Sequence, residues 1–326
     1  MSKAIEQIKV GGAARARFAA LMQRQGAVVA LMLVCVFAAV RYPRFLTEEN
    51  LLNVLRQNSM LGLVALGMTF VILTGGIDLS VGALLAVAGV VAANFAGYGA
   101  IPAVLAGVGS ATVLGLINGL VISVARMQPF IVTLAMMIAA RGVALAWTGE
   151  QSVRVSQLSA GLTKLGRGWV GPIPVPVLIL VVAYVVGWVL LKYTRFGRHV
   201  YAIGDNEEAA RLMGLNVGRV QLGVYALSGA LAGLGGVLLA ARLGAGQPVA
   251  GIGWELDAIA SVVVGGTLLA GGQGGVGSTF VGVLLLGVIF NLFNLEGTIS
   301  PWWQLVLRGL ILLGVVIMQN RLKGRQ

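Results

Sequence analysis

Two long stretches of this chain carry no charged side chain. Residues from Leu79 to Ala125 and from Ala258 to Leu295 include no Asp, Glu, Lys or Arg. Each stretch is long enough for two membrane spans, because a transmembrane helix needs roughly 20 apolar residues. The whole sequence is 58% hydrophobic and only 10% charged. These values place the chain in a membrane and exclude a soluble enzyme held by a single anchor.

Apolar segments recur along the whole sequence. Ten candidates lie at about 25–41, 57–76, 79–97, 102–125, 128–148, 173–191, 220–241, 256–271, 276–295 and 301–319. The segment 256–271 is short and contains Gly265 and Gly266, so we expect it to be broken or re-entrant. The sequence therefore predicts an all-α polytopic membrane protein with about ten, and at least eight, transmembrane helices in one domain over 25–320.

The basic residues predict the orientation. If all ten segments cross, 14 Lys and Arg residues share the side of the termini and seven lie on the other side. The 14 occupy the arm 1–24, Arg126, the loop 192–219 and the tail 321–326. By the positive-inside rule, both termini are cytoplasmic and the loop 149–172 is periplasmic. The net charge of +12 thus indicates topology rather than nucleic-acid binding.

The cytoplasmic loop contains "GDNEEAARLMG", which has its own helix signals. Asp205 is the expected N-cap, Glu208 completes a capping box, and Gly214 ends the helix. A helix of about eight residues is marginal alone in water. Its apolar side chains therefore need a surface, either the chain's own membrane domain or a cytoplasmic partner. These side chains are Ala209, Ala210, Leu212 and Met213.

The stretch "TGGIDLSVG" places Asp78 between apolar segments with no basic residue nearby. A carboxylate at the centre of a span costs about 2.5–3.5 kcal/mol even on insertion scales. Gly75 and Gly76 can end one helix, so that Asp78 or Ser80 caps the next. Asp78 can also belong to a transport path, and the two roles are compatible.

Other polar residues lie in or beside apolar segments. Arg141 either extends toward the interface or meets a partner inside the bundle. Asn118, Asn291 and Asn294 either join helices by hydrogen bonds or line a pore. Glu255 and Asp257 stand at the outer end of a segment, where water is available and a helix N-terminus favours acidic charge.

Several kinds of chemical site are excluded or unsupported. Cys35 and His199 are the only residues of their types, so an intrachain disulfide or a His cluster is impossible and we expect no metal site. The run "GGTLLAGGQGGVG" lacks the Lys and Ser/Thr that end a phosphate-binding loop. We therefore interpret this run as a hinge or a close helix crossing, and we expect no enzymatic activity.

Three ordered motifs connect the sequence to a known family. They are "LGMTFVILTGGIDLSVGALLAVAGVVAA", "NEEAARLMGLNV", and "WELDAIASVVVGGTLLAGGQGGVGSTFVG" followed by "NLFNL". These stretches closely resemble the permease subunits of bacterial monosaccharide ABC importers, the ribose permease family. The resemblance runs from about Leu46 to Val316.

The resemblance implies partners for this chain. They are a second permease copy, a cytoplasmic sugar-type ATPase that binds ATP and Mg²⁺, and a periplasmic sugar-binding protein. No cofactor is then expected in this chain. The ATPase would be contacted by Gly204, Asp205, Asn206, Glu207, Glu208, Ala209, Ala210, Arg211 and Gly214.

The resemblance also gives regional expectations for the substrate. Transport-path candidates are Asp78, Ser80, Asn118, Arg141, Asn291 and Asn294, and periplasmic-side candidates are Gln247, Glu255 and Asp257. The substrate would be a ribose-like pentose or a related sugar or polyol. Two alternatives are an ion-coupled transporter that uses Asp78 or Asp257 as a relay, and a membrane scaffold without transport activity.

Overall fold

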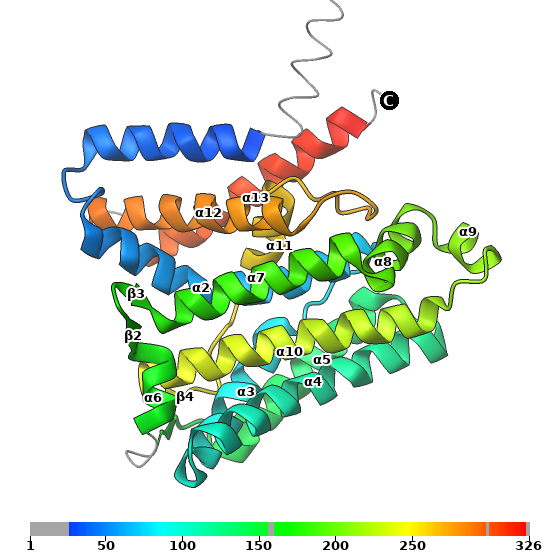
Figure 1. The fold of residues 1–326 in the computed structure, drawn as a ribbon, viewed down its shortest axis with the longest axis horizontal. Coiled ribbons are helices and arrows are strands. Elements are labelled where there is room, and N and C mark those ends of the chain that lie inside the picture. Colours follow the sequence, from blue (N-terminus) through cyan, green and yellow to red (C-terminus); the bar gives the residue numbers. More distant parts are fainter. Residues whose placement is uncertain (1–25, 156–159, 298–299, 324–326) are drawn as a thin grey trace, which may run out of the picture.

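The computed structural model describes residues 26–155, 160–297 and 300–323, and these are mostly helical (Figure 1). The predicted basic arm 1–24 and the last residues of the tail lie outside the described residues. The helices are Gly26–Arg41, α2 (Glu48–Leu73), α3 (Val81–Phe95), η1 (Ala96–Tyr98), α4 (Ala100–Ala125), α5 (Pro129–Thr148), α6 (Ala160–Arg167), α7 (Val175–Tyr193), α8 (Arg195–Asp205), α9 (Glu207–Leu212), α10 (Val217–Leu243), α11 (Trp254–Val264), α12 (Val276–Glu296) and α13 (Pro301–Lys323).

The only strands in the described part of the chain are two residues long and form two small antiparallel pairs. β1 (Val153–Arg154) pairs with β4 (Ala245–Gly246), and β2 (Trp169–Val170) pairs with β3 (Ile173–Pro174). β2 and β3 close the loop between α6 and α7, whereas β1 and β4 join two loops that are far apart in the sequence. The fold is therefore the all-α polytopic fold that the composition predicts.

Seven helices in the described residues are long and apolar enough to cross a membrane: α2, α3 with η1, α4, α5, α7, α10 and α12. The total of ten crossing segments stays a prediction. The segment predicted over 256–271 is helical only in α11, which has 11 residues and is followed by non-helical chain to 275. It is broken, as the glycines in it indicate.

α2 begins nine residues earlier than its apolar segment predicts. The side chain of Thr47 accepts the backbone N–H of Asn50, and Glu48 and Glu49 occupy the first turn. An N-cap and acidic residues at this position stabilise the start of a helix through its unpaired N–H groups and its dipole. The polar stretch before the apolar run is therefore helical as well.

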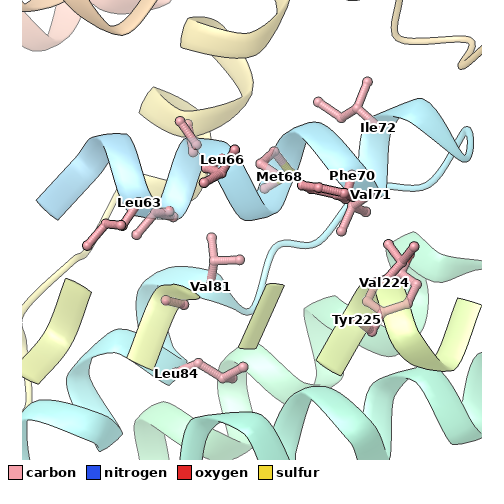
Figure 2. Packing of buried hydrophobic residues seen from close by; sticks show 14 of the residues in the cluster. Leu63, Leu66, Met68, Phe70, Val71, Ile72, Val81, Leu84, Val224 and Tyr225 are labelled. Carbon is pink, nitrogen blue, oxygen red and sulfur yellow. The ribbon is translucent and has the colours of Figure 1, made fainter. Parts of the chain in front are cut away.

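α2, α3 and α10 form the centre of the protein. Most of each is buried inside the chain, whereas only a minority of α4, α5 and α7 is buried. Figure 2 shows Leu63 and Val71 of α2, Leu84 of α3 and Tyr225 of α10 in this core, and all four are buried. Apolar helices on the outside, with buried helices between them, are the arrangement that a lipid environment permits.

Glycines let α4 and α10 approach each other closely. A Cβ at Gly115 would lie 2.4 Å from the carbonyl oxygen of Tyr225, and one at Gly229 would lie 2.4 Å from the carbonyl oxygen of Ala111. Small residues spaced by four allow such backbone contact between membrane helices. Gly115 and Gly119 on α4, and Gly229 and Gly233 on α10, are pairs of this kind, and each lies close to the facing helix.

Loops that we expect on the same side of the membrane lie together. At one end, β1 pairs with β4, and the Arg167 guanidinium Nε donates to the carbonyl oxygen of Arg242 over 2.6 Å. At the other end, the Tyr201 hydroxyl donates to the carbonyl oxygen of Gly274 over 2.9 Å. Burial raises the pKa of Tyr201, so its hydroxyl stays protonated and able to donate. Figure 1 shows β4 and α6 at the edge opposite to α8 and α9.

The glycine contact yields a stability prediction. Gly115→Ala should lower the melting temperature of the purified protein in detergent, because overpacking against a backbone oxygen costs about 1–3 kcal/mol. Gly109→Ala on the same helix meets no atom within 4 Å, so it should leave stability unchanged or raise it, since Ala favours helix over Gly by about 1 kcal/mol. Equal shifts in the two variants would contradict the close packing of α4 on α10.

Candidate functional site

The chain reverses direction between α2 and α3, and Asp78 lies in this reversal. α2 ends at Leu73, and Gly75 has a φ of +78°, which favours glycine. Gly76 has no room for a side chain, because a Cβ there would lie 2.6 Å from the Tyr225 hydroxyl oxygen. The two glycines thus end the helix as the sequence predicts, and they turn Asp78 into the protein core.

The Asp78 carboxyl group is fully buried and accepts three hydrogen bonds. Its Oδ1 accepts the backbone N–H of Ser80 at 3.0 Å and the hydroxyl of Ser80 at 2.5 Å. Its Oδ2 accepts the hydroxyl of Ser228 on α10 at 2.8 Å. A buried polar group is tolerated when such partners replace water, so neutral donors satisfy Asp78.

Ser80 links this carboxyl group to a third helix. Its hydroxyl oxygen accepts Nδ2 of Asn118 on α4 at 3.0 Å. Asp78, Ser80, Asn118 and Ser228 therefore form one buried polar network that joins the start of α3 to α4 and α10. Ser228 was not predicted from the sequence. Its hydroxyl beside Gly229, in a helix rich in small residues, is only a weak signal of a buried polar contact.

The predicted helix cap is only partly correct. Ser80 occupies the N-cap position of α3, but its side chain makes no capping hydrogen bond to the helix. Asp78 bonds the N–H of Ser80 instead of an N–H inside the helix. The hydroxyl of Ser80 instead donates to Asp78, and its oxygen accepts the side-chain N–H of Asn118. These residues hold helices together, and their transport role stays a prediction.

Arg141 meets partners inside the protein. Its Nη1 donates to the carbonyl oxygens of Pro248 at 2.5 Å and Ala250 at 2.7 Å, so α5 holds the loop before α11. Glu255, in the first turn of α11, accepts the backbone N–H of Gly253 at 3.2 Å, and Gln247 in the loop is half-buried. Of the two alternatives for Arg141, the structure supports the internal partner.

A polar cavity of about 210 Å³ lies between α2, α11, α12 and α13. Asn291 and Asn294 line it, as does Asp257, which is only 6% exposed and not solvated as we expected. Asn291 also exchanges two hydrogen bonds with Asn50, at 3.1 and 2.8 Å. Asp257 and the two asparagines are thus brought together at one cavity, away from the Asp78 network.

Sequence reasoning missed three other polar residues of this cavity. Gln57 and Asn58 come from α2, and Gln304 comes from the first turn of α13. A signal exists for the pair on α2, because two adjacent carboxamides precede a long apolar run. Their meeting with α12 and α13 depends on tertiary packing that the sequence pattern does not contain.

The helix in "GDNEEAARLMG" forms one residue later than its capping pattern predicts. Asn206 is the N-cap, and its Oδ1 accepts the N–H of Ala209 at 2.9 Å. The N-cap prediction for Asp205 is wrong, because Asp205 is the last residue of α8. α8 is itself unpredicted and starts at the side-chain cap Thr194. Gly214, with a φ of +83°, ends the helix as expected.

α9 buries one apolar residue and exposes two others at its end. Ala210 is buried, whereas Leu212 is 84% exposed and the adjoining Met213 is 71% exposed. Glu207 and Arg211 form an ion pair of 2.7 Å on the exposed surface of α9. The protein's own membrane domain therefore receives only part of the apolar surface of "EEAARLM".

The base of this element is fixed by backbone contacts. A Cβ at Gly204 would lie 1.8 Å from the carbonyl oxygen of Leu73, so only glycine fits there. The same carbonyl oxygen accepts the N–H of Gly272 at 3.0 Å. The end of α2, the end of α8 and the glycine-rich loop after α11 therefore meet at one junction, consistent with the close crossing expected for that loop.

A family model described as "Branched-chain amino acid transport system / permease component" matches residues 50–316. The chain belongs to this permease family. The ribose import permease protein RbsC of Bacillus subtilis is 44% identical over 309 residues, covering 94% of this chain and 96% of that protein. RbsC of Escherichia coli K12 is 41% identical over 311 residues, covering 93% and 95%.

A relative named for another sugar also matches. The L-arabinose ABC transporter permease protein AraH of Azospirillum brasilense is 35% identical over 308 residues, covering 94% of this chain and 90% of that protein. No solved structure matches the chain. The resemblance to monosaccharide ABC permeases is confirmed, so this is a multi-pass membrane permease subunit and not an enzyme. This membership gives no support to an ion-coupled transporter or a passive scaffold.

The Asp78 network yields a second prediction. Asp78→Ala should lower thermal stability markedly, because it leaves buried donors unpaired at a cost of about 1–3 kcal/mol each. Asp78→Asn keeps an acceptor oxygen and should lose less stability. Ser228→Ala, which leaves the Oδ2 of Asp78 without its donor, should cost about 1–3 kcal/mol. Unfolding in detergent measures all three. An Asp78→Ala protein as stable as wild type would refute the structural role.

Proposed function

We propose that this permease moves a ribose-like monosaccharide across the bacterial inner membrane as the membrane-spanning subunit of an ATP-driven importer. The observation that carries the proposal is the 41–44% identity to ribose import permeases over nearly the whole chain. Relatives named for D-allose and L-arabinose match less closely, at 36% and 35%. This order of sequence identities favours a ribose-like sugar over D-allose and L-arabinose.

In this proposal α9 and its flanks bind the ATPase, which itself holds ATP and Mg²⁺. The exposed Leu212 and Met213 support this role, since apolar side chains on a short helix end are suited to a partner's groove. The glycine junction at Gly204 supports it too, because it connects the base of α9 to α2 by direct backbone contact. A force applied to α9 would be transmitted to α2 through this junction.

The opposite face would receive the sugar from a periplasmic binding protein. The proposed orientation is supported by the excess of basic residues on the α8–α9 side, which favours cytoplasmic termini. The binding protein as partner is supported by the permease family. We also propose that two copies of the chain assemble around one path. The largely exposed apolar surfaces of α4 and α5 leave room for a second copy as well as for lipid.

Reconstitution tests the transport function directly. Proteoliposomes that contain the permease, its ATPase and D-ribose-loaded binding protein should accumulate D-ribose only with ATP. The permease alone with an imposed proton or sodium gradient should not. Uptake driven by a gradient without the ATPase would refute the ABC mechanism, and ATP-driven uptake that excludes D-ribose, D-allose and L-arabinose would refute the proposed substrate class.

The docking role of α9 yields a third prediction. The double variant Leu212→Asp and Met213→Asp should reduce co-purification of the ATPase at least tenfold, because it places two charges in an apolar contact. Leu46→Asp is the matched control, since Leu46 is 62% exposed at the opposite end of the protein. The control should retain the ATPase. Full ATPase binding by the α9 double variant would contradict the docking role.

A further inference from the structure

The polar cavity between α2, α11, α12 and α13 has an unusual lining for a protein this apolar. Five of its side chains are carboxamides, and they come from three helices that are separated in the sequence: Gln57, Asn58, Asn291, Asn294 and Gln304. A carboxamide within a membrane protein is costly unless it finds hydrogen-bond partners. Asn58, Asn291 and Gln304 are half-buried, whereas Gln57 and Asn294 are exposed. Five such groups around one cavity suit a polar occupant.

Three of these carboxamides have no hydrogen bond to any residue that the structure describes: Gln57, Asn294 and Gln304. The other two are held in place, because Asn58 donates to the carbonyl oxygen of Val54 at 2.7 Å and Asn291 pairs with Asn50. The cavity thus combines fixed polar groups with groups that are free to bind something else. Such a set of oriented and available groups is typical of a ligand site.

The chemistry of the lining selects a class of ligand. Each carboxamide has an N–H₂ donor and a carbonyl acceptor, which match a hydroxyl group that both donates and accepts. None of the lining residues is basic, so the lining offers no positive charge to a phosphate or carboxylate. Trp254 and Phe290 add aromatic surface, against which the C–H groups of a sugar ring can pack.

The size and position of the cavity agree with a monosaccharide. Its volume of about 210 Å³ is below the range of about 300–1,000 Å³ that is usual for drug-sized ligands, so it suits a smaller molecule. Asn294 is in the last turn of α12, Gln304 is in the first turn of α13, and Trp254 begins α11. All three lie at the end of the protein that we predict to be periplasmic.

We infer that this cavity is a binding site within the permease for a neutral monosaccharide arriving from the periplasmic side. Its carboxamides bind the sugar hydroxyls, and Trp254 and Phe290 contact the ring. The inference rests on the proposed function and deepens it, because it assigns the permease a sugar site separate from that of the binding protein. Asp78, Ser80 and Asn118, which line no part of this cavity, take no part in the site.

Cysteine labelling tests the site in the assembled transporter. Cys35 is the only cysteine, so Cys35→Ala gives a clean background once its transport is confirmed. In that background, Gln57→Cys and Gln304→Cys should react with a membrane-impermeant maleimide added from the periplasmic side. Neither substitution removes a side-chain hydrogen bond, because the side chains of Gln57 and Gln304 bond to no residue that the structure describes. D-ribose should slow the reaction several-fold at both positions.

Asn53→Cys is the matched control. Asn53 is exposed on α2, one helical turn before Gln57, and it does not line the cavity. It should react at the same rate with and without D-ribose. D-ribose 5-phosphate should protect neither cavity position, because no basic residue is present to bind its phosphate.

The outcomes separate this inference from the proposed function. D-ribose, D-allose and L-arabinose are tested for ATP-driven uptake by the same complexes. If one of these three sugars is taken up but none of them protects either cavity cysteine, the cavity site is overturned. The proposed transport function is not affected by that result. Protection by the phosphate ester equal to that by the sugar would overturn the assignment to a neutral ligand. Cavity cysteines that never react would overturn periplasmic access.

Discussion

The reversal of the chain at Asp78 depends on one set of hydrogen bonds. A buried carboxyl group without a basic partner is held by a backbone N–H and two hydroxyl groups. Those hydroxyls belong to α3's N-cap residue and to α10, and the first of them also binds Asn118 of α4. Because α3 and α10 are largely buried, the placement of these two central helices, and of α4 beside them, depends on these few polar atoms.

Close backbone contacts at glycine residues provide the second constraint. They act at the start of the same reversal, where α2 ends. Leu73 ends α2, and its carbonyl oxygen accepts Gly272 while Gly204 lies against it. Larger residues at Gly204 would separate α8 from α2. The short segment from Leu73 to Ser80 is thus fixed at one end by backbone contacts and at the other by a polar network, which leaves it little freedom to bend.

The sequence contains enough information to predict the fold class, the break after α2 and the broken segment at α11. Each depends on a local pattern, a charge-free run or a glycine pair, whose physical effect does not need the rest of the protein. The N-cap at Asp205 could not be placed correctly, because Asp205 and Asn206 are both good caps and the choice depends on where α8 ends. α8 itself has a mixed polar and apolar pattern that resembles a loop.

The candidate site was less predictable for a similar reason. Asn291 and Asn294 are identifiable as polar residues in an apolar segment, but only packing decides that they face Gln57 and Gln304 instead of Asn118. Asp257 has the sequence context of a solvated helix start, yet α2 and α12 pack against α11 and leave it buried. Polarity in the sequence indicates which residues need partners, and the tertiary fold decides which partners they receive.

α2 contacts both regions to which we propose a function. Its outer half contributes Gln57 and Asn58 to the polar cavity, and its last residue, Leu73, contacts the base of the α8–α9 element. A helix of 26 residues is about 39 Å long, comparable to a membrane. It is also buried for most of its length, so its packing resists bending. A displacement at α9 therefore has a direct mechanical route to the cavity through one helix.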